Sequence, residues 1–131
     1  MALRLTTYSY GSPRRRGEGL RLGCTRYSVR GVPRGEYAAR NIWDVWLPTL
    51  APSRELLAWA RRKGVERGEN WREFERRYRR EMETTDARQV IRTLAQIAKR
   101  TPISIGCYCR GPHCHRFILE RIIRSAAENG F

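Results

Sequence analysis

The sequence predicts an α/β fold, a three-layer single domain in which helices flank a small, mainly parallel sheet. Three observations lead to this prediction. The chain of 131 residues has the usual length of one domain, so we treat residues 1–131 as a single unit. Amphipathic helical patterns dominate the second half of the chain. Between two of these patterns lies a short β-rich run, residues 103–109, which is typical of a buried parallel strand.

The first third of the chain is expected to supply two further strands and a basic loop. Residues 3–10 and 20–27 are rich in β-branched and aromatic side chains, as strands usually are. The segment between them, 11–19, contains three consecutive arginines (14–16), so we expect a mobile, strongly positive loop that is a candidate for phosphate contact. Residues 41–51 carry two Trp and a Pro, and we expect an irregular, largely buried segment there.

Four helices are expected in the rest of the chain, and their starting signals are visible. Ser53 is an N-cap candidate for the first helix, and Asn70 with Glu73 resembles a capping box at the start of the second. Pro102 ends the third helix. The predicted helices cover residues 54–63, about 71–83, 86 to near 101, and about 114–129.

The charge of the chain indicates the kind of partner to expect. The formal net charge is +14, and 25 of the 27 basic residues are Arg. Guanidinium groups match phosphate oxygens in pairs and stack on bases, which favours nucleic acid or a phosphorylated small molecule as partner. Thermal adaptation, with the charges on solvated helix faces, is an alternative explanation of the same composition.

The sequence also bears on the cellular compartment. No apolar run is long enough to cross a bilayer, and residues 1–10 lack an apolar signal core. We therefore expect a cytoplasmic protein with no membrane partner. In that compartment the four Cys are expected to be thiols, metal ligands or catalytic groups before disulfides.

Residues 107–116 are the expected functional segment. In parallel sheets, ligands bind beyond the carboxyl ends of the strands and near helix N-termini, and this segment links a strand to a helix. It holds both His residues of the chain and three of its four Cys. Cys114 falls near the predicted helix start, where unpaired N–H groups stabilise a thiolate or a bound anion.

Three kinds of site are compatible with these residues, and the first is an anion site. It would be formed by the arginines near the two strands, which are Arg26, Arg30, Arg110 and Arg116. The Cys-loop-Arg phosphatases bind phosphate in a similar loop. Their five intervening residues differ, however, from the six that separate Cys109 from Arg116 here.

The second kind of site is a metal site. Zn would be held in a tetrahedral shell by Cys107, Cys109, Cys114 and His113. The spacing of these ligands is tighter than that of the usual Cys-x₂-Cys knuckles. Cys24, at the end of the second predicted strand, is a further residue that could approach.

The third kind of site is a reactive thiol. Cys114, His115 and Arg116 would be the catalytic residues, since a Cys at a helix start beside His and Arg should have a lowered pKa. Mid-strand Cys107 fits a plain core residue as well, because Cys is often buried. An interaction domain with inert thiols is therefore a further alternative, and whether the protein is an enzyme stays open.

Four ordered motifs run along the chain: Arg30-Gly-Val, the Leu-Ala-Pro-Ser that ends at Ser53, Trp71-x-x-Phe-x-x-x-Tyr78, and Gly106-Cys-Tyr-Cys followed by Cys114-His-Arg116. Together they resemble the prokaryotic family known as domain of unknown function 488. The resemblance implies a compact, cytosolic, single-domain α/β protein, and it implies no particular activity. One branch of the family has an acidic residue where this chain has Thr25.

The leading hypothesis from these residues is that the segment binds or processes a phosphate-bearing ligand, either a nucleotide or nucleic acid. The alternative is a metal-binding or redox-sensing module without turnover. We also expect Arg26 to lie near the segment, which requires the second strand to neighbour the strand that precedes it.

Overall fold

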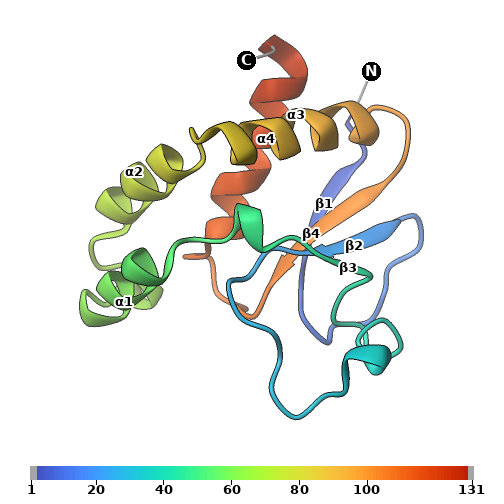
Figure 1. Cartoon of the computed structure of the whole chain (residues 1–131), viewed down its shortest axis with the longest axis horizontal. Helices are drawn as coiled ribbons and strands as arrows, with labels where there is room; N and C mark the ends of the chain where they lie inside the picture. The colour runs from blue at the N-terminus through green and yellow to red at the C-terminus, as the bar shows by residue number, and fades with distance from the viewer. Residues whose placement is uncertain (1–2, 130–131) are drawn as a thin grey trace.

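The computed structural model describes residues 3–129 and has the predicted α/β fold (Figure 1). Four parallel strands form one sheet in the order β1-β4-β2-β3. The chain runs β1 (Leu5–Ser9), β2 (Leu20–Gly23), η1 (Arg34–Glu36), β3 (Val45–Trp46), η2 (Pro48–Leu50), α1 (Arg54–Arg62), η3 (Val65–Arg67), α2 (Trp71–Glu81), α3 (Thr85–Ala98), β4 (Ile103–Cys107) and α4 (His115–Asn129).

The strand β4 lies at the centre of the sheet. Its five residues are buried, and it pairs with β1 on one side and β2 on the other. A strand buried on both faces and both edges consists mostly of apolar and small residues, as Ile103-Ser-Ile-Gly-Cys107 does. The expected adjacency of the second strand and the strand before the functional segment is therefore confirmed.

The helices cover one face of the sheet. Leu5, Leu22, Ile103 and Ile105 point to this face and share one core with apolar residues of all four helices. In Figure 1, α3 lies across α4, while α1 and α2 lie beside one end of the sheet. No described helix is both long enough and apolar enough to span a membrane.

The opposite face of the sheet is covered by loop segments and the short helix η1, with no α-helix among the described residues. An aromatic cluster fills it, formed by Tyr8, Tyr10, Tyr37, Ile42 and Trp43. Glycines in the strands make room for these rings. A Cβ on Gly106 would lie 2.3 Å from the Tyr8 ring, and one on Gly23 would lie 2.3 Å from Trp43.

Two sequence expectations about local structure fail. Asn70 does not cap α2 with its side chain, because its backbone is left-handed (φ 57°) and its Nδ2 donates instead to the Lys63 carbonyl. Residues 41–51, expected to be irregular, include the short edge strand β3. By contrast, the Ser53 hydroxyl accepts the Leu56 N–H at 3.1 Å as an N-cap does.

Candidate functional site

The carboxyl ends of β1, β4 and β2 meet at the start of α4. The register pairs Ser9 with Cys107 and Gly23 with Gly106. Pairing continues one step further, because the Cys24 N–H donates to the Gly106 carbonyl at 3.0 Å. This edge of the sheet is where parallel α/β folds present ligand-binding groups.

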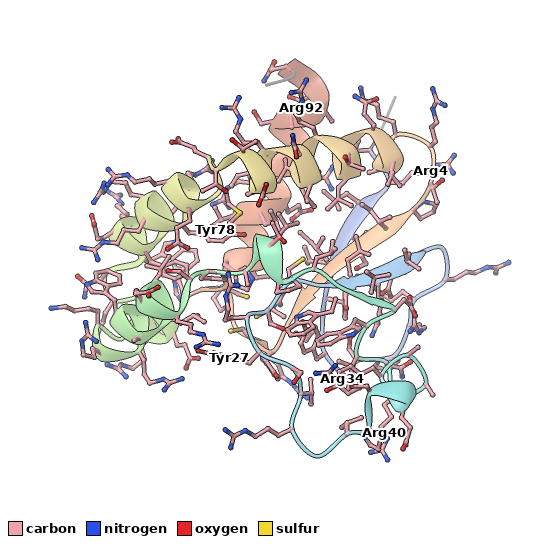
Figure 2. All side chains as sticks on the ribbon, in the orientation of Figure 1. Arg4, Tyr27, Arg34, Arg40, Tyr78 and Arg92 are labelled. Carbon is pink, nitrogen blue, oxygen red and sulfur yellow. The ribbon has the colours of Figure 1, made fainter. Side chains whose placement is uncertain are left out.

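Two thiols and one imidazole converge at this point. The Nδ1 atom of His115 lies 3.8 Å from the Cys107 sulfur and 3.9 Å from the Cys114 sulfur. The three atoms all lie within 4.8 Å of one another, and the three residues are buried. Figure 2 shows sulfur atoms, in yellow, between the ends of the central strands and the start of α4.

The second ring nitrogen of His115 determines its tautomer. Nε2 lies 2.6 Å from the carbonyl oxygen of Cys24, which can only accept, so Nε2 carries the hydrogen. Burial lowers the pKa of His115 to about 4, so the ring is neutral near pH 7. The lone pair of Nδ1 therefore faces the two thiols.

Cys109 is the most exposed sulfur of the site. It is half-buried, whereas Cys24, Cys107 and Cys114 are buried. Hydrogen bonds from Cys107 and then Cys114, together with the charge of Arg116, hold the pKa of the Cys109 thiol well below its usual range. The hydrogen bond that Cys107 gives to Cys109 raises the pKa of Cys107, so its proton is retained. Cys109 is therefore the thiol of this group whose ionised form is most favoured.

Cys114 differs from Cys109 although it lies next to the start of α4. A hydrogen bond from Cys107 and one from the Arg116 backbone favour its thiolate, but its hydrogen bond to Cys109 and its burial outweigh them. The pKa of Cys114 is raised to about 11 as a result. Cys114 thus acts as a hydrogen-bond donor toward Cys109.

Arg116 supports the loop between β4 and α4, and it lies outside the lining of the cavity at this edge of the sheet. Its side chain is buried, stacks 4.5 Å from the Phe117 ring centre, and donates from one terminal nitrogen to the Cys109 carbonyl. Its Nε atom is buried without a hydrogen-bond partner among the described residues. Arg116 therefore positions Cys109 through its backbone carbonyl, and the buried positive charge of Arg116 favours the ionised form of the Cys109 thiol.

A cavity of about 410 Å³ opens onto the sulfur atoms. Cys107, Cys109, Cys114 and His115 form its floor. One wall comes from α1, η3 and the turn between them, and it carries Arg61 and Arg67. The lining also includes Thr25, Arg26, Tyr27, Pro52, Leu57, Ala60, Gly64, Val65, Glu66, Phe74, Tyr108 and His113.

The arginines expected to bind an anion do not all reach this cavity. Arg26 lines it, although its Nε and one terminal nitrogen donate to the carbonyls of Pro52 and Ala51. Arg30 and Arg110 are exposed and lie outside the lining. Of the three arginines in the basic loop, Arg14 pairs with Asp44 at 2.9 Å and Arg15 donates to the Thr7 carbonyl at 2.7 Å.

The two histidine side chains lie in different surroundings. His115 belongs to the thiol cluster, whereas His113 packs edge-on against Trp71, with 5.2 Å between ring centres, and lies over Gly68. His115 therefore takes the position in the cluster that the sequence analysis assigned to His113. Thr25, at the position that is acidic in one branch of the family, bonds through its hydroxyl to the Tyr10 hydroxyl at 2.7 Å.

Sequence reasoning missed the wall of the cavity. Residues 64–68 fall between two predicted helices, and η3 forms there between two left-handed glycines, Gly64 (φ 66°) and Gly68 (φ 91°). These conformations favour Gly and turn the chain back toward β4. The two glycines that flank Val65–Arg67 are the only sequence signal for this turn.

Residues 5–127 match the family model described as "Active DUF488-N3 subclade". That description gives no reaction. The search of curated proteins gave no match, nor did the search of solved structures. Since the matched region covers nearly all of the chain and contains the whole thiol cluster, the chain belongs to the DUF488 family.

Proposed function

We propose that the protein binds a phosphate-bearing ligand, a nucleotide or nucleic acid, in the cavity and acts on it through Cys109. The observation that carries this proposal is that the half-buried Cys109 lines the cavity together with three arginines, Arg26, Arg61 and Arg67, of which Arg67 also pairs with Glu69. Arg61 forms no ion pair within the part of the chain that the structure describes. An anionic ligand would supply the missing negative charge.

The proposed chemistry is nucleophilic displacement. The Cys109 sulfur forms a bond to an electrophilic atom of the ligand, and the leaving group departs with the electron pair of the broken bond. Water then displaces the sulfur: the water oxygen bonds to the ligand, the released proton passes to the departed leaving group, and Cys109 is again a thiolate. Cys107 and Cys114 stabilise that thiolate by hydrogen bonds before and after the step.

Alkylation kinetics test this proposal. Iodoacetamide is applied at pH 6, the modified Cys is identified by mass spectrometry, and nucleoside monophosphates are added as protecting ligands. We expect Cys109 to react first, and we expect protection that Arg61→Ala weakens. Arg76→Ala is the matched control, because Arg76 lies on α2 outside the cavity and pairs with Glu73. Equal protection in both variants would reject the proposal, and so would a wild-type protein whose Cys109 is protected neither by nucleoside monophosphates nor by a single-stranded oligonucleotide.

A second candidate function is metal binding, and a specific geometry favours it. The metal-binding atoms of Cys107, Cys114 and His115 face one another, and the His115 Nε2–H is held by a carbonyl, as in many zinc sites. Cys109 would be the fourth ligand. Metal analysis of freshly purified protein tests this function: stoichiometric Zn should be lost in His115→Gln and retained in His113→Gln. Metal-free wild-type protein would rule it out.

The proposed ligands and the four free thiols also fit a reducing compartment, so we propose a cytoplasmic location. Fractionation of cells that express the chain, followed by immunoblotting, tests this location. Recovery with the membrane or secreted fraction would contradict it.

A further inference from the structure

Two exposed tyrosines stand at the mouth of the cavity. Tyr27 is 50% exposed and Tyr108 is 47% exposed, and they are two of the five large apolar or aromatic residues with high exposure among the described residues. Tyr27 is labelled in Figure 2. Exposed aromatic faces beside a polar, charged cavity are the usual partners of unstacked bases.

Tyr108 is held firmly although it is exposed. Its hydroxyl donates to the Ser28 carbonyl at 2.8 Å, and its ring packs edge-on against Tyr10 with 5.0 Å between ring centres. Such a ring can receive a stacked group without first losing much freedom. Tyr108 and Cys109 both line the cavity, so a base on the Tyr108 ring would place the attached sugar within the same cavity as the Cys109 sulfur.

The arginines of α1 extend this surface beyond the cavity. Arg54, Leu57 and Arg61 share one helix face, because residues three, four and seven apart are neighbours on a helix. Leu57 and Arg61 line the cavity, and the Arg54 guanidinium lies 5.7 Å from the Tyr27 ring centre. Seven residues of helix span about 10 Å, so the two charges can contact separate phosphates of one strand.

Helix α1 also differs from α2 in how its charge is balanced. Three of the five arginines of α2, which are Arg76, Arg77 and Arg79, pair with Glu73 and Glu75. Within residues 3–129, Arg54, Arg61 and Arg62 of α1 form no ion pair. An uncompensated basic face next to a cavity is the electrostatic pattern of a polyanion site.

We propose that the cavity receives one nucleotide of a single-stranded nucleic acid, with its base on Tyr108 and Tyr27 and its neighbouring phosphates on α1. This inference rests on the proposed function and specifies its ligand. A free nucleotide would not use Arg54 or Arg62, which lie outside the cavity lining. A duplex would not fit either, because its bases are stacked and could not reach sulfur atoms at the cavity floor.

Fluorescence anisotropy with a labelled oligonucleotide of mixed sequence tests the inference. The single strand should bind at least tenfold more tightly than the same sequence as a duplex, with affinity that falls as salt rises. Tyr108→Ala should weaken binding roughly 5- to 100-fold, which is the usual effect of losing one stacked base. Tyr108→Phe, which keeps the ring, should retain most of the affinity. Tyr27→Ala serves as a second test if Tyr108→Ala does not fold.

The charge variants complete the test. The double variant Arg54→Ala/Arg61→Ala should make the salt dependence shallower, by about one unit of slope for each phosphate that the protein no longer binds. The double variant Arg76→Ala/Arg77→Ala removes the same amount of charge from α2, where both arginines are ion-paired, and should change the slope little.

Equal binding of single strand and duplex, or equal effects of the two double variants, would overturn the inference. If nucleoside monophosphates protect Cys109 while no strand binds, the inference fails and the proposed function stands. If neither protects nor binds, both fail.

Discussion

The Nε2 atom of His115 donates its hydrogen to the carbonyl oxygen of Cys24 over 2.6 Å, and this bond ties the start of α4 to the end of β2. The two residues lie 91 positions apart in the chain. The bond occupies one ring nitrogen and directs the other toward the sulfur atoms. It thereby links the stability of the fold to the arrangement of the site.

Replacing His115 should therefore affect stability. His115→Phe leaves the buried Cys24 carbonyl without its donor, so the free energy of unfolding should fall by about 1–3 kcal/mol. Urea denaturation measures this change. His113→Phe is the matched control and should have a smaller effect, because His113 is half-buried and contacts a ring. Equal losses in the two variants would show that the carbonyl bond is not the cause.

The thiols should differ in their pH dependence. Because the pKa of Cys109 is lowered, its alkylation rate should stay nearly constant between pH 8 and pH 6, whereas the rate of an ordinary thiol, with a pKa of about 8.5, falls almost tenfold per unit there. Cys107→Ala removes the main hydrogen-bond donor and should restore ordinary behaviour. Cys24, whose pKa burial raises to about 12, should stay unmodified in the folded protein. A wild-type rate that falls tenfold per pH unit would contradict this assignment.

The buried ion pair of Glu18 and Arg21 should govern acid stability. Burial opposes ionisation of Glu18, but hydrogen bonds from Arg21 and from the Arg15 backbone outweigh it and lower its pKa. A carboxyl group with a lowered folded pKa stabilises the fold above its unfolded pKa of about 4.3, and this stability is lost as pH falls through the folded pKa. Glu18→Gln should lose this acid dependence.

At neutral pH the same variant should be strongly destabilised. Glu18→Gln leaves the guanidinium of Arg21, which is 0% exposed, without a counter-charge, and breaking such a pair usually costs about 3–5 kcal/mol. Thermal or urea unfolding at pH 7 measures the loss. Glu73→Gln is the control at an exposed ion pair and should have little effect. Similar unfolding curves for the two variants would be inconsistent with this account.

The close approach of Gly106 to Tyr8 predicts a steric effect. A Cβ at Gly106 would lie 2.3 Å from the ring, so Gly106→Ala should lower the free energy of unfolding by about 1–3 kcal/mol or more. Gly35→Ala is the control, because an added Cβ there meets nothing within 4 Å. Differential scanning calorimetry of the two variants decides the point. A Gly106→Ala protein as stable as the Gly35→Ala protein would mean that the ring moves aside freely.

Much of the fold was accessible from the sequence because periodicity reports burial directly. The apolar run before Pro112 identified the central strand, and helical spacing located all four helices to within a few residues. The edge strand Val45–Trp46 was missed, since a pair of residues carries no periodic signal. The loop layer on the second face was missed as well, because it is formed by tertiary packing of aromatic residues.

The site was predictable in position but not in detail. The sequence placed its thiols in a segment that links a strand to the last helix, and in the structure Cys107 ends β4 while Cys114 directly precedes α4. It could not distinguish His113 from His115, because the path of the loop between Cys109 and α4 follows no repeating pattern. It could not identify Cys109 as the thiolate either, since that property depends on hydrogen bonds between sulfur atoms.

The cavity is built from two parts that the chain supplies separately. The sulfur atoms rest on the sheet and on α4, whereas most of the opposite wall comes from one continuous stretch that runs from Pro52 through η3. Substitutions in that stretch can alter which molecule is admitted while the reactive atoms keep their arrangement. Relatives that prefer different ligands can thus arise by substitutions within this one stretch, while the thiols at the cavity floor keep their arrangement.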